Sequence, residues 1–136
     1  MKYLIENRKI KVDEFQQMRA TTGWAMLEDS VVERGLEKDL HSVCVSYNGK
    51  LIGIGRVIGD GAMYFYIQDI IVIPEYQKKG IGNLIMENIE DYIQKNTFNN
   101  SFIGLMAANG VKGFYNRYGF VERTDNRPGM SKLIKK

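Results

Sequence analysis

The spacing of apolar and polar residues changes period along the chain, and each change marks an expected element. Apolar residues recur at helical spacing over 12–22 and again over 24–40, after a short apolar segment at 3–6 that predicts a strand. From residue 42 the period becomes two, and the pair Asn48-Gly49 supplies the favoured hairpin turn before a second alternating run that ends at 58. The expected inward side chains of the two helices are Val12, Phe15, Met18 and Arg19 in the first and Leu27, Val31 and Leu36 in the second.

The second half of the chain continues with alternating strands and helices. A strand is expected over 63–73, and its last four residues are apolar on both faces, as in a central strand covered on both sides. A helix over 80–95, a strand over 102–107 and a helix that begins after Asn109 follow. Segments 120–123 and 130–134 are expected to pair as two closing antiparallel strands. The pattern as a whole predicts one α/β domain over residues 1–136.

Composition narrows the class of protein. The chain is 44% hydrophobic and 26% charged, and no apolar run approaches the ~20 residues that a membrane span needs, so we expect a soluble, cytoplasmic protein without a signal peptide. The net charge of +3 is dispersed, which does not favour nucleic acid or membrane partners. One cysteine, Cys44, and one histidine, His41, leave no zinc cluster, and on a strand they would point to opposite faces. We therefore expect neither a metal site nor a Cys-His nucleophile pair.

The segment with the clearest chemistry lies where the 63–73 strand ends. Four apolar residues are followed by Pro74, a short basic turn and two glycines, Gly80 and Gly82, at the start of a helix. Backbone N–H groups in a helix's first turn have no intrahelical acceptor and carry the positive end of the helix dipole, so they bind anions. Glycines at 80 and 82 allow close approach of the backbone. The pattern predicts a socket for a diphosphate.

This segment resembles the coenzyme A binding motif of the GCN5-related N-acetyltransferase (GNAT) family, a Gln or Arg followed by x-x-Gly-x-Gly or Ala. Gln77, Gly80 and Gly82 occupy the three fixed positions. A second segment, from Asn109 through Phe114-Tyr115 to Gly119-Phe120, is similar to the family's other hallmark and places Tyr115 at its catalytic tyrosine position. The resemblance implies a mixed, mostly antiparallel central sheet flanked by helices. It also implies direct transfer of an acetyl group from acetyl-CoA to a primary amine in a ternary complex.

The resemblance assigns roles to individual residues. A backbone N–H, here that of Val72, would stabilise the thioester oxygen, and the strand edge at Ile70 and Val72 would pair with the pantetheine amides. Tyr115 would reprotonate the thiolate, because a phenol of pKa about 10 can serve a thiol of pKa about 8.5 as an acid. The expected cofactor contacts are Ile70, Ile71, Val72, Gln77, Lys78, Lys79, Gly80, Ile81, Gly82, Asn83, Asn109 and Tyr115.

The sequence specifies the residues around the acceptor amine less fully than those around the cofactor. Asp69 is the first choice as general base for the amine, although it might equally pair with Arg56 or orient a loop. Trp24 and Glu28 are the expected substrate contacts, and Asp29 and Glu33 are alternatives to Glu28 as an attractor for a cationic amine. Structural roles for Tyr115, Trp24 and these carboxylates stay open. Family members acetylate many kinds of amine, so a small-molecule amine is expected without its identity, and a homodimer is an open expectation.

Other nucleotide-binding classes fit poorly. A dinucleotide fingerprint needs a third glycine, which Gly80-Ile81-Gly82-Asn83-Leu84-Ile85 lacks, and no P-loop sequence occurs. The remaining alternative to an enzyme is a module of the same fold that binds acetyl-CoA as a sensor or partner-binding domain without transferring the acetyl group.

Overall fold

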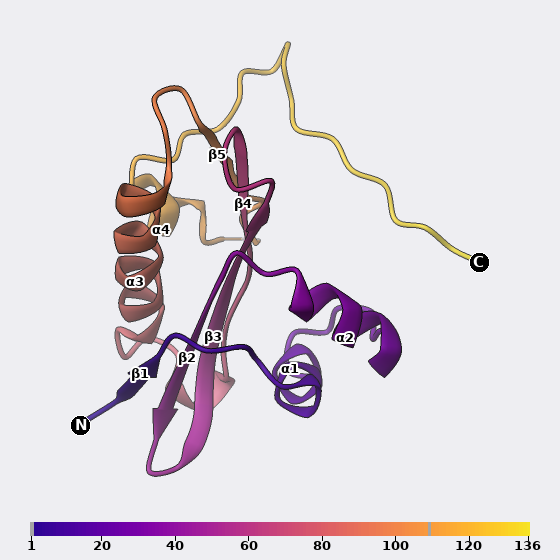
Figure 1. Cartoon of the computed structure of the whole chain (residues 1–136), viewed down its shortest axis with the longest axis vertical. Helices are drawn as coiled ribbons and strands as arrows, with labels where there is room; N and C mark the ends of the chain where they lie inside the picture. The colour runs from indigo at the N-terminus through magenta and orange to yellow at the C-terminus, as the bar shows by residue number, and fades with distance from the viewer. Residues whose placement is uncertain (1, 109) are drawn as a thin grey trace. The chain divides into compact units, whose positions relative to one another are not determined.

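The computed structural model describes residues 2–108 and 110–136 (Figure 1). The chain contains two compact units, residues 1–105 and 106–136. The first contains the elements β1 (Leu4–Glu6), α1 (Val12–Arg19), α2 (Asp29–Glu37), β2 (His41–Tyr47), β3 (Lys50–Gly59), β4 (Tyr64–Val72), a 3-10 turn (Pro74–Tyr76), α3 (Ile81–Asn96) and β5 (Phe102–Gly104). The second contains the short helix α4 (Lys112–Asn116).

The described strands form one sheet in the order β1-β2-β3-β4-β5. Every neighbouring pair is antiparallel except β4 and β5, which run parallel. The Asn48-Gly49 turn joins β2 to β3, and both of its residues have positive φ, as a two-residue hairpin turn requires. The prediction of a mixed, mostly antiparallel sheet flanked by helices is confirmed.

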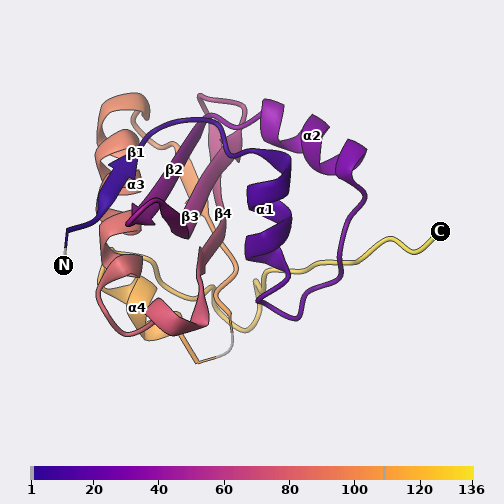
Figure 2. The same cartoon turned by 90° about the horizontal axis from the view of Figure 1, so that it is seen from below.

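Helices cover both faces of this sheet. Helix α3 lies on one side and α1 and α2 lie on the other (Figure 2). The close approach of α3 depends on two glycines of β3, because a Cβ at Gly53 would lie 3.0 Å from Ile81 and one at Gly55 would lie 2.7 Å from Ile85. The opposite face buries Phe15 and Met18 of α1 as the sequence predicts.

Strand β4 carries a bulge at its centre. Ile54 pairs with Ile71 and Arg56 pairs with Gln68, so Gly55 alone lies opposite both Asp69 and Ile70. Asp69 adopts a positive φ of 56°, which is uncommon for a residue with a side chain. A bulge of this kind re-aims a side chain within a strand. Here it turns a carboxylate toward the side of the sheet that carries α1 and α2.

The second helix is shorter than predicted, and the predicted stripe was wrong in part. Helix α2 begins at Asp29 instead of residue 24, and its buried side chains are Val32 and Leu36, whereas Leu27 and Val31 are exposed. Residues 24–28 form a connection whose carbonyls accept hydrogen bonds from α1. Arg19 donates to the carbonyl of Ala25 (2.7 Å) and Gln16 donates to that of Leu27 (2.6 Å). These bonds replace the intrahelical bonds that the periodicity suggested.

The predicted closing strands, 120–123 and 130–134, are wrong, since residues 120–136 contain no strand. Phe120 is half-buried, but the other apolar side chains of these segments are exposed, Val121 by 84% and Met130 by 86%. A lone pair of strands is marginal in water without a further strand or helix to pack on, and among the described residues of 106–136 the structure offers only α4. The strand expected over 102–107 likewise ends at Gly104.

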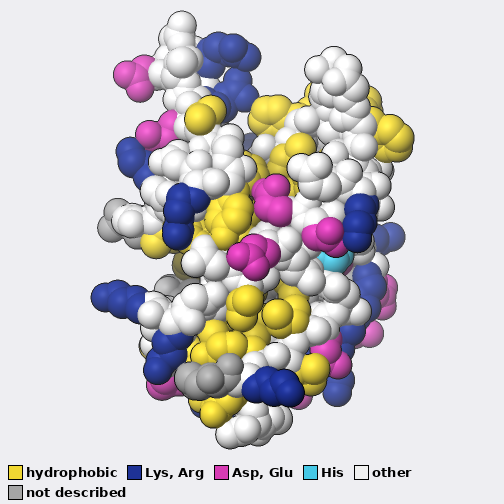
Figure 3. Space-filling view, turned by 90° about the vertical axis from the view of Figure 1, so that its left-hand side faces the viewer, with side chains coloured by type: hydrophobic (Ala, Val, Ile, Leu, Met, Phe, Trp, Pro, Cys, Tyr) yellow, Lys and Arg dark blue, Asp and Glu magenta, His cyan; other side chains and the backbone are white. Residues whose placement is uncertain are grey.

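The surface carries charges of both signs. Acidic and basic side chains are interspersed on the face of Figure 3. Among the described residues, no helix combines the length and the apolar character that crossing a bilayer demands.

The packing of α3 against β3 gives a stability prediction. Gly55→Ala would place a methyl group 2.7 Å from Ile85 Cγ2 and 2.9 Å from Ile70 Cδ1, so the free energy of unfolding should fall by about 1–3 kcal/mol. Urea denaturation measures the change. Gly35→Ala is the control, because its methyl group meets only Arg56 Nη2 at 4.0 Å and should cost nothing. Equal stability of the Gly55 variant and the wild type would contradict this packing.

Candidate functional site

The end of β4 presents one peptide away from the sheet. Ile73 donates its backbone N–H to the carbonyl of Ile52 on β3 (3.0 Å). Backbone groups of successive strand residues point to alternate edges, so the N–H and C=O of Val72 point away from β3. Its carbonyl accepts a hydrogen bond from Nε2 of Gln77 (3.0 Å). The Val72 N–H therefore lies on the same outer edge as the Gln77 side chain.

Along most of its length, the described residues place no strand beside that edge. In the described part of the chain, β5 pairs with β4 only where Tyr64–Tyr66 faces Phe102–Gly104. The remainder of β4, residues 67–72, has a strand neighbour on the β3 side alone. Ile71 is paired with Ile54 and its side chain is buried, whereas Ile70 and Val72 flank it with half-buried side chains. An extended amide-bearing ligand can pair with such an edge as an added strand.

A tight turn connects this edge to α3. After Pro74–Tyr76, two residues have positive φ, Lys78 at 63° and Gly80 at 85°. Left-handed residues in a turn gather neighbouring N–H groups into a concave anion-binding nest. Residues 77–80 are exposed, so solvent reaches these groups. No atom lies within 4 Å of a Cβ built on Gly80, and its role is therefore conformational.

The first turn of α3 is fixed by a buried anchor. The side chain of Ile81 is only 1% exposed and lies under the helix against the sheet, so Ile81 can reach a ligand only through its backbone. The amide of Leu84 in α3 donates to the carbonyl of Gly80 (3.2 Å). The amides at 81–83 precede it at the positive end of a 16-residue helix. Lys78 and Lys79 add two exposed cations beside them.

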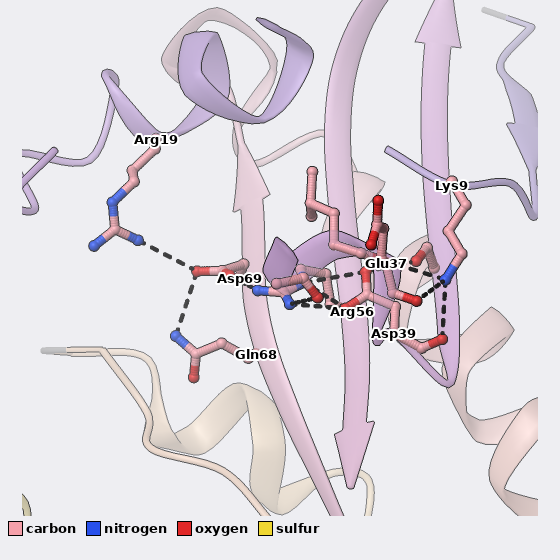
Figure 4. Close-up of polar contacts among 10 residues, drawn as sticks. Lys9, Arg19, Glu37, Asp39, Arg56, Gln68 and Asp69 are labelled. Carbon is pink, nitrogen blue, oxygen red and sulfur yellow. Dashed lines mark hydrogen bonds and ion pairs between the residues drawn. The ribbon is translucent and has the colours of Figure 1, made fainter. Parts of the chain in front are cut away.

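Asp69 belongs to a buried network of charges (Figure 4). Arg56 donates to Asp69 Oδ2 (2.8 Å) and, through Nε and Nη2, to Asp39 Oδ1 (2.9 and 2.7 Å). Burial would lower the pKa of Arg56, but the hydrogen bonds to Asp39 and Asp69 raise it overall, which keeps the guanidinium charged. Lys9 donates to the carbonyls of Leu36, Glu37 and Asp39 and thereby fixes the segment that carries Asp39. The expected alternative for Asp69, a pair with Arg56, is confirmed.

The expected acceptor contacts Trp24 and Glu28 lie in the connection between α1 and α2. Trp24 is 41% exposed, and the guanidinium of Arg19 lies over its ring at 5.6 Å. Glu28 is exposed and precedes the first residue of α2, and its carbonyl accepts from the amides of Val31 and Val32. Arg19 also approaches Asp69, with Nη1 3.9 Å from Oδ1. The structure thus groups Trp24 with Arg19 and Asp69, while Glu28 faces solvent.

Tyr115 lies in the second unit, within an aromatic cluster. Its ring packs edge-on against Phe114 (5.0 Å between centroids) and Phe120 (6.4 Å). Its carbonyl accepts from the amide of Phe120 (3.3 Å), and Gly119 ends the turn with a φ of 87°. Burial raises the pKa of the Tyr115 phenol, so the hydroxyl keeps its proton at neutral pH. Asn109 lies outside the described residues.

Cys44 is not part of any site. Its side chain is fully buried, and burial raises the pKa of its thiol to about 11, so it is protonated at neutral pH. His41, three residues away on β2, stacks on Tyr92 of α3. Across the described residues, no three His, Cys, Asp or Glu side chains come together in a way that could hold a metal ion.

Three partners in the network, Arg19, Asp39 and Gln68, do not emerge from the sequence. The helical periodicity places Asp39 in a helix and Arg19 only on an inward stripe. The signal that could have found them is a set of opposite charges on elements that pack together, but no sequence spacing connects residues 19, 39, 56 and 69. Nε2 of Gln68 lies 3.3 Å from Asp69 Oδ1.

Comparisons with known proteins find similar acetyltransferases. The sequence model described as "Acetyltransferase (GNAT) domain" matches residues 11–130 and so extends across both units. An uncharacterized N-acetyltransferase, ycf52, of Pyropia yezoensis is 27% identical over 134 residues, covering 94% of this chain and 75% of that protein. GCN5-related N-acetyltransferase 1 of Arabidopsis thaliana is 30% identical over 124 residues, covering 89% of this chain but only 61% of that protein.

A solved structure is similar over nearly the whole chain. The crystal structure of a probable acetyltransferase of unknown function from methicillin-resistant Staphylococcus aureus superposes with a TM-score of 0.91 and 29% identity. The match covers 98% of this chain and 100% of that one.

The buried network predicts an unequal response to the loss of two aspartates. The Asp39 side chain is 0% exposed, and Asp39→Ala leaves the Arg56 guanidinium with unpaired buried donors, so the free energy of unfolding should fall by about 3 kcal/mol or more. Asp91→Ala removes an exposed pair with Lys95 and should cost less than about 0.5 kcal/mol. Chemical denaturation distinguishes the two, and similar losses would show that the Asp39 pair is not a buried one.

Proposed function

The chain belongs to the GNAT family of acetyltransferases, and on that premise we propose that it transfers the acetyl group of acetyl-CoA to a primary amine of a small molecule by direct attack in a ternary complex. One observation carries the proposal. The outward Val72 N–H, the unpaired edge of β4 and the amides that open α3 follow one another within about a dozen residues on a single unit.

These residues fit acetyl-CoA as a co-substrate. The exposed turn at 77–80 and the amides at 81–83 suit a diphosphate, which needs several N–H donors and positive charge. The edge at Ile70 and Val72 suits the pantetheine arm, whose amides can pair with a strand. When bound, acetyl-CoA supplies the acetyl group as an activated thioester. Gln77 serves the turn itself, because its side-chain amide is hydrogen-bonded to Val72.

Two groups of this chain act on the two reacting partners. The Val72 N–H donates a hydrogen bond to the thioester oxygen, where negative charge develops as the amine attacks. The amine must lose a proton, because an ammonium has no lone pair to attack with. Asp69 Oδ1 accepts that proton directly or through water. The other carboxylate oxygen, Oδ2, is the one that accepts the short hydrogen bond from Arg56. Asp69 is three residues before Val72 on the same strand.

The leaving thiolate needs a proton, and Tyr115 supplies it. A tyrosine whose pKa is raised by burial holds its proton throughout the neutral range, as a general acid must. Glu28, Asp29 and Glu33 are exposed at the start of α2 and contribute long-range attraction for amines that arrive as cations.

The placement of the diphosphate predicts the effect of a single carboxylate. Gly82→Asp puts a negative charge in the first turn of α3, where it is compatible with the helix dipole but repels a phosphate. Acetyl-CoA affinity measured by calorimetry should fall by at least about 100-fold. Gln94→Asp, at the exposed far end of the same helix, should bind normally. Normal binding by the Gly82 variant would remove the diphosphate from this turn.

The role of Tyr115 is tested by loss of one hydroxyl. Tyr115→Phe should lower kcat by about 10²- to 10⁴-fold while the Kd for acetyl-CoA stays unchanged, because the hydroxyl acts only on the leaving group. Tyr118→Phe, in the same aromatic cluster, should keep the wild-type rate. Rates are followed as release of free CoA thiol. A Tyr115 variant with the wild-type rate from about pH 6 to 9 would show that the tyrosine is not the acid.

A further inference from the structure

Arg19 is held in place by contacts that leave most of its donors free. Its Nε donates to the carbonyl of Ala25 (2.7 Å), and its guanidinium lies over the Trp24 ring at 5.6 Å. Both contacts come from the connection between α1 and α2. They fix the direction of the side chain without using the four N–H groups on Nη1 and Nη2.

Nη1 of Arg19 faces Asp69 on β4. Figure 4 shows Arg19 of α1 and Gln68 of β4 directed at Asp69 from two sides. The nearest Arg19 nitrogen lies 3.9 Å from Asp69 Oδ1, which is an ion pair but too long for a hydrogen bond. Within the part of the chain that the structure describes, no other carboxylate forms an ion pair with Arg19. The side chain is only 15% exposed, so its charge is partly desolvated as well as incompletely paired.

Arg56, in the same network, differs from Arg19 because all three of its guanidinium nitrogens donate hydrogen bonds within the protein. It uses Nε, Nη1 and Nη2 on Asp39, Asp69 and the carbonyl of Gly35. Oδ2 of Asp69 accepts a hydrogen bond from Arg56 at 2.8 Å. Arg19 is therefore the cation of this network that has donors left for a ligand.

Resting on the proposed function, we propose that Arg19 binds a carboxylate carried by the acceptor, so that the substrate class is carboxylate-bearing primary amines such as amino acids. A planar carboxylate matches the two terminal nitrogens of a guanidinium in a bidentate pair. Asp69 Oδ1 lies next to Arg19, with loose contacts of 3.9 Å to Arg19 and 3.3 Å to Gln68. It can receive the amine of the same molecule beside the carboxylate.

The charge of the network favours a monoanion. Arg19 and Arg56 balance Asp39 and Asp69, so a carboxylate adds one negative charge, whereas a phosphate dianion adds two with no further cation among these four groups. The Arg19 guanidinium already occupies a face of the Trp24 ring, so that face is not open to a cationic amine.

The test compares acceptors that differ only in the carboxylate. Wild-type protein and Arg19→Gln are assayed with phenylalanine and phenethylamine, with lysine and cadaverine, and with phosphoethanolamine, by release of free CoA thiol. The amino acid of each pair should have the higher kcat/KM in the wild type. Arg19→Gln should reduce that preference by about 10- to 100-fold through KM, as expected for the loss of a charged hydrogen-bonded pair. Arg34→Gln, on the exposed surface of α2, is the matched control and should keep the preference.

The outcomes separate this inference from the proposed function. Equal or better use of the decarboxylated amines by the wild type, or a preference for phosphoethanolamine that depends on Arg19, overturns the carboxylate assignment while acetyl transfer stands. If acetyl-CoA binds but no amine is acetylated, the proposed function fails. Binding of the N-acetylated compounds then tests whether Arg19 recognises a carboxylate. N-acetylphenylalanine should then raise the Tm of the wild type but not that of Arg19→Gln, whereas N-acetylphenethylamine should raise neither. Absence of that difference overturns the inference.

Discussion

Ile73 donates its backbone N–H to Ile52, and that bond orients the peptide on which the site depends. It closes the ladder between β3 and β4, and it leaves the neighbouring Val72 peptide facing outward. Gln77 then holds the Val72 carbonyl from the turn that leads to α3. Because β5 stops pairing at Tyr66, the outward N–H meets no strand in the described part of the chain. This ladder bond thus orients the peptide that connects the proposed oxyanion donor to the turn proposed to bind the diphosphate.

The buried charges connect this edge to the other face of the sheet. Arg56 joins Asp39, which follows α2, to Asp69 in the β4 bulge, and Arg19 of α1 approaches the same carboxylate. A buried pair of this kind is costly to break, so it fixes the bulge and the backbone of β4 around it. The bulge in turn aims Asp69 at the α1 side while Val72 faces the edge. The groups proposed as proton acceptor and as oxyanion donor thereby lie on one strand and face two directions.

Much of this arrangement could be predicted from local pattern. The hairpin at Asn48-Gly49, the strand that ends at Pro74 and the glycine turn into α3 each depend on neighbouring residues, and the sequence is sufficient for them. The extent of α2 could not be predicted, because Arg19 and Gln16 bind the carbonyls of the preceding connection and so compete with a helix there. The Arg19 and Asp39 contacts depend on packing between distant elements, for which the chain has no periodic signal. The predicted strands at 120–123 and 130–134 do not form, because an alternation of apolar and polar residues does not by itself supply an element for them to pack on.

The most direct test of the account follows single backbone amides during a titration of the ¹⁵N-labelled protein with acetyl-CoA by NMR. The largest chemical-shift changes should occur at Val72, the proposed oxyanion donor, and at residues 78–83, the proposed diphosphate donors. Saturable binding that leaves these amides unchanged and shifts others would contradict the claim that this edge and this turn hold the co-substrate.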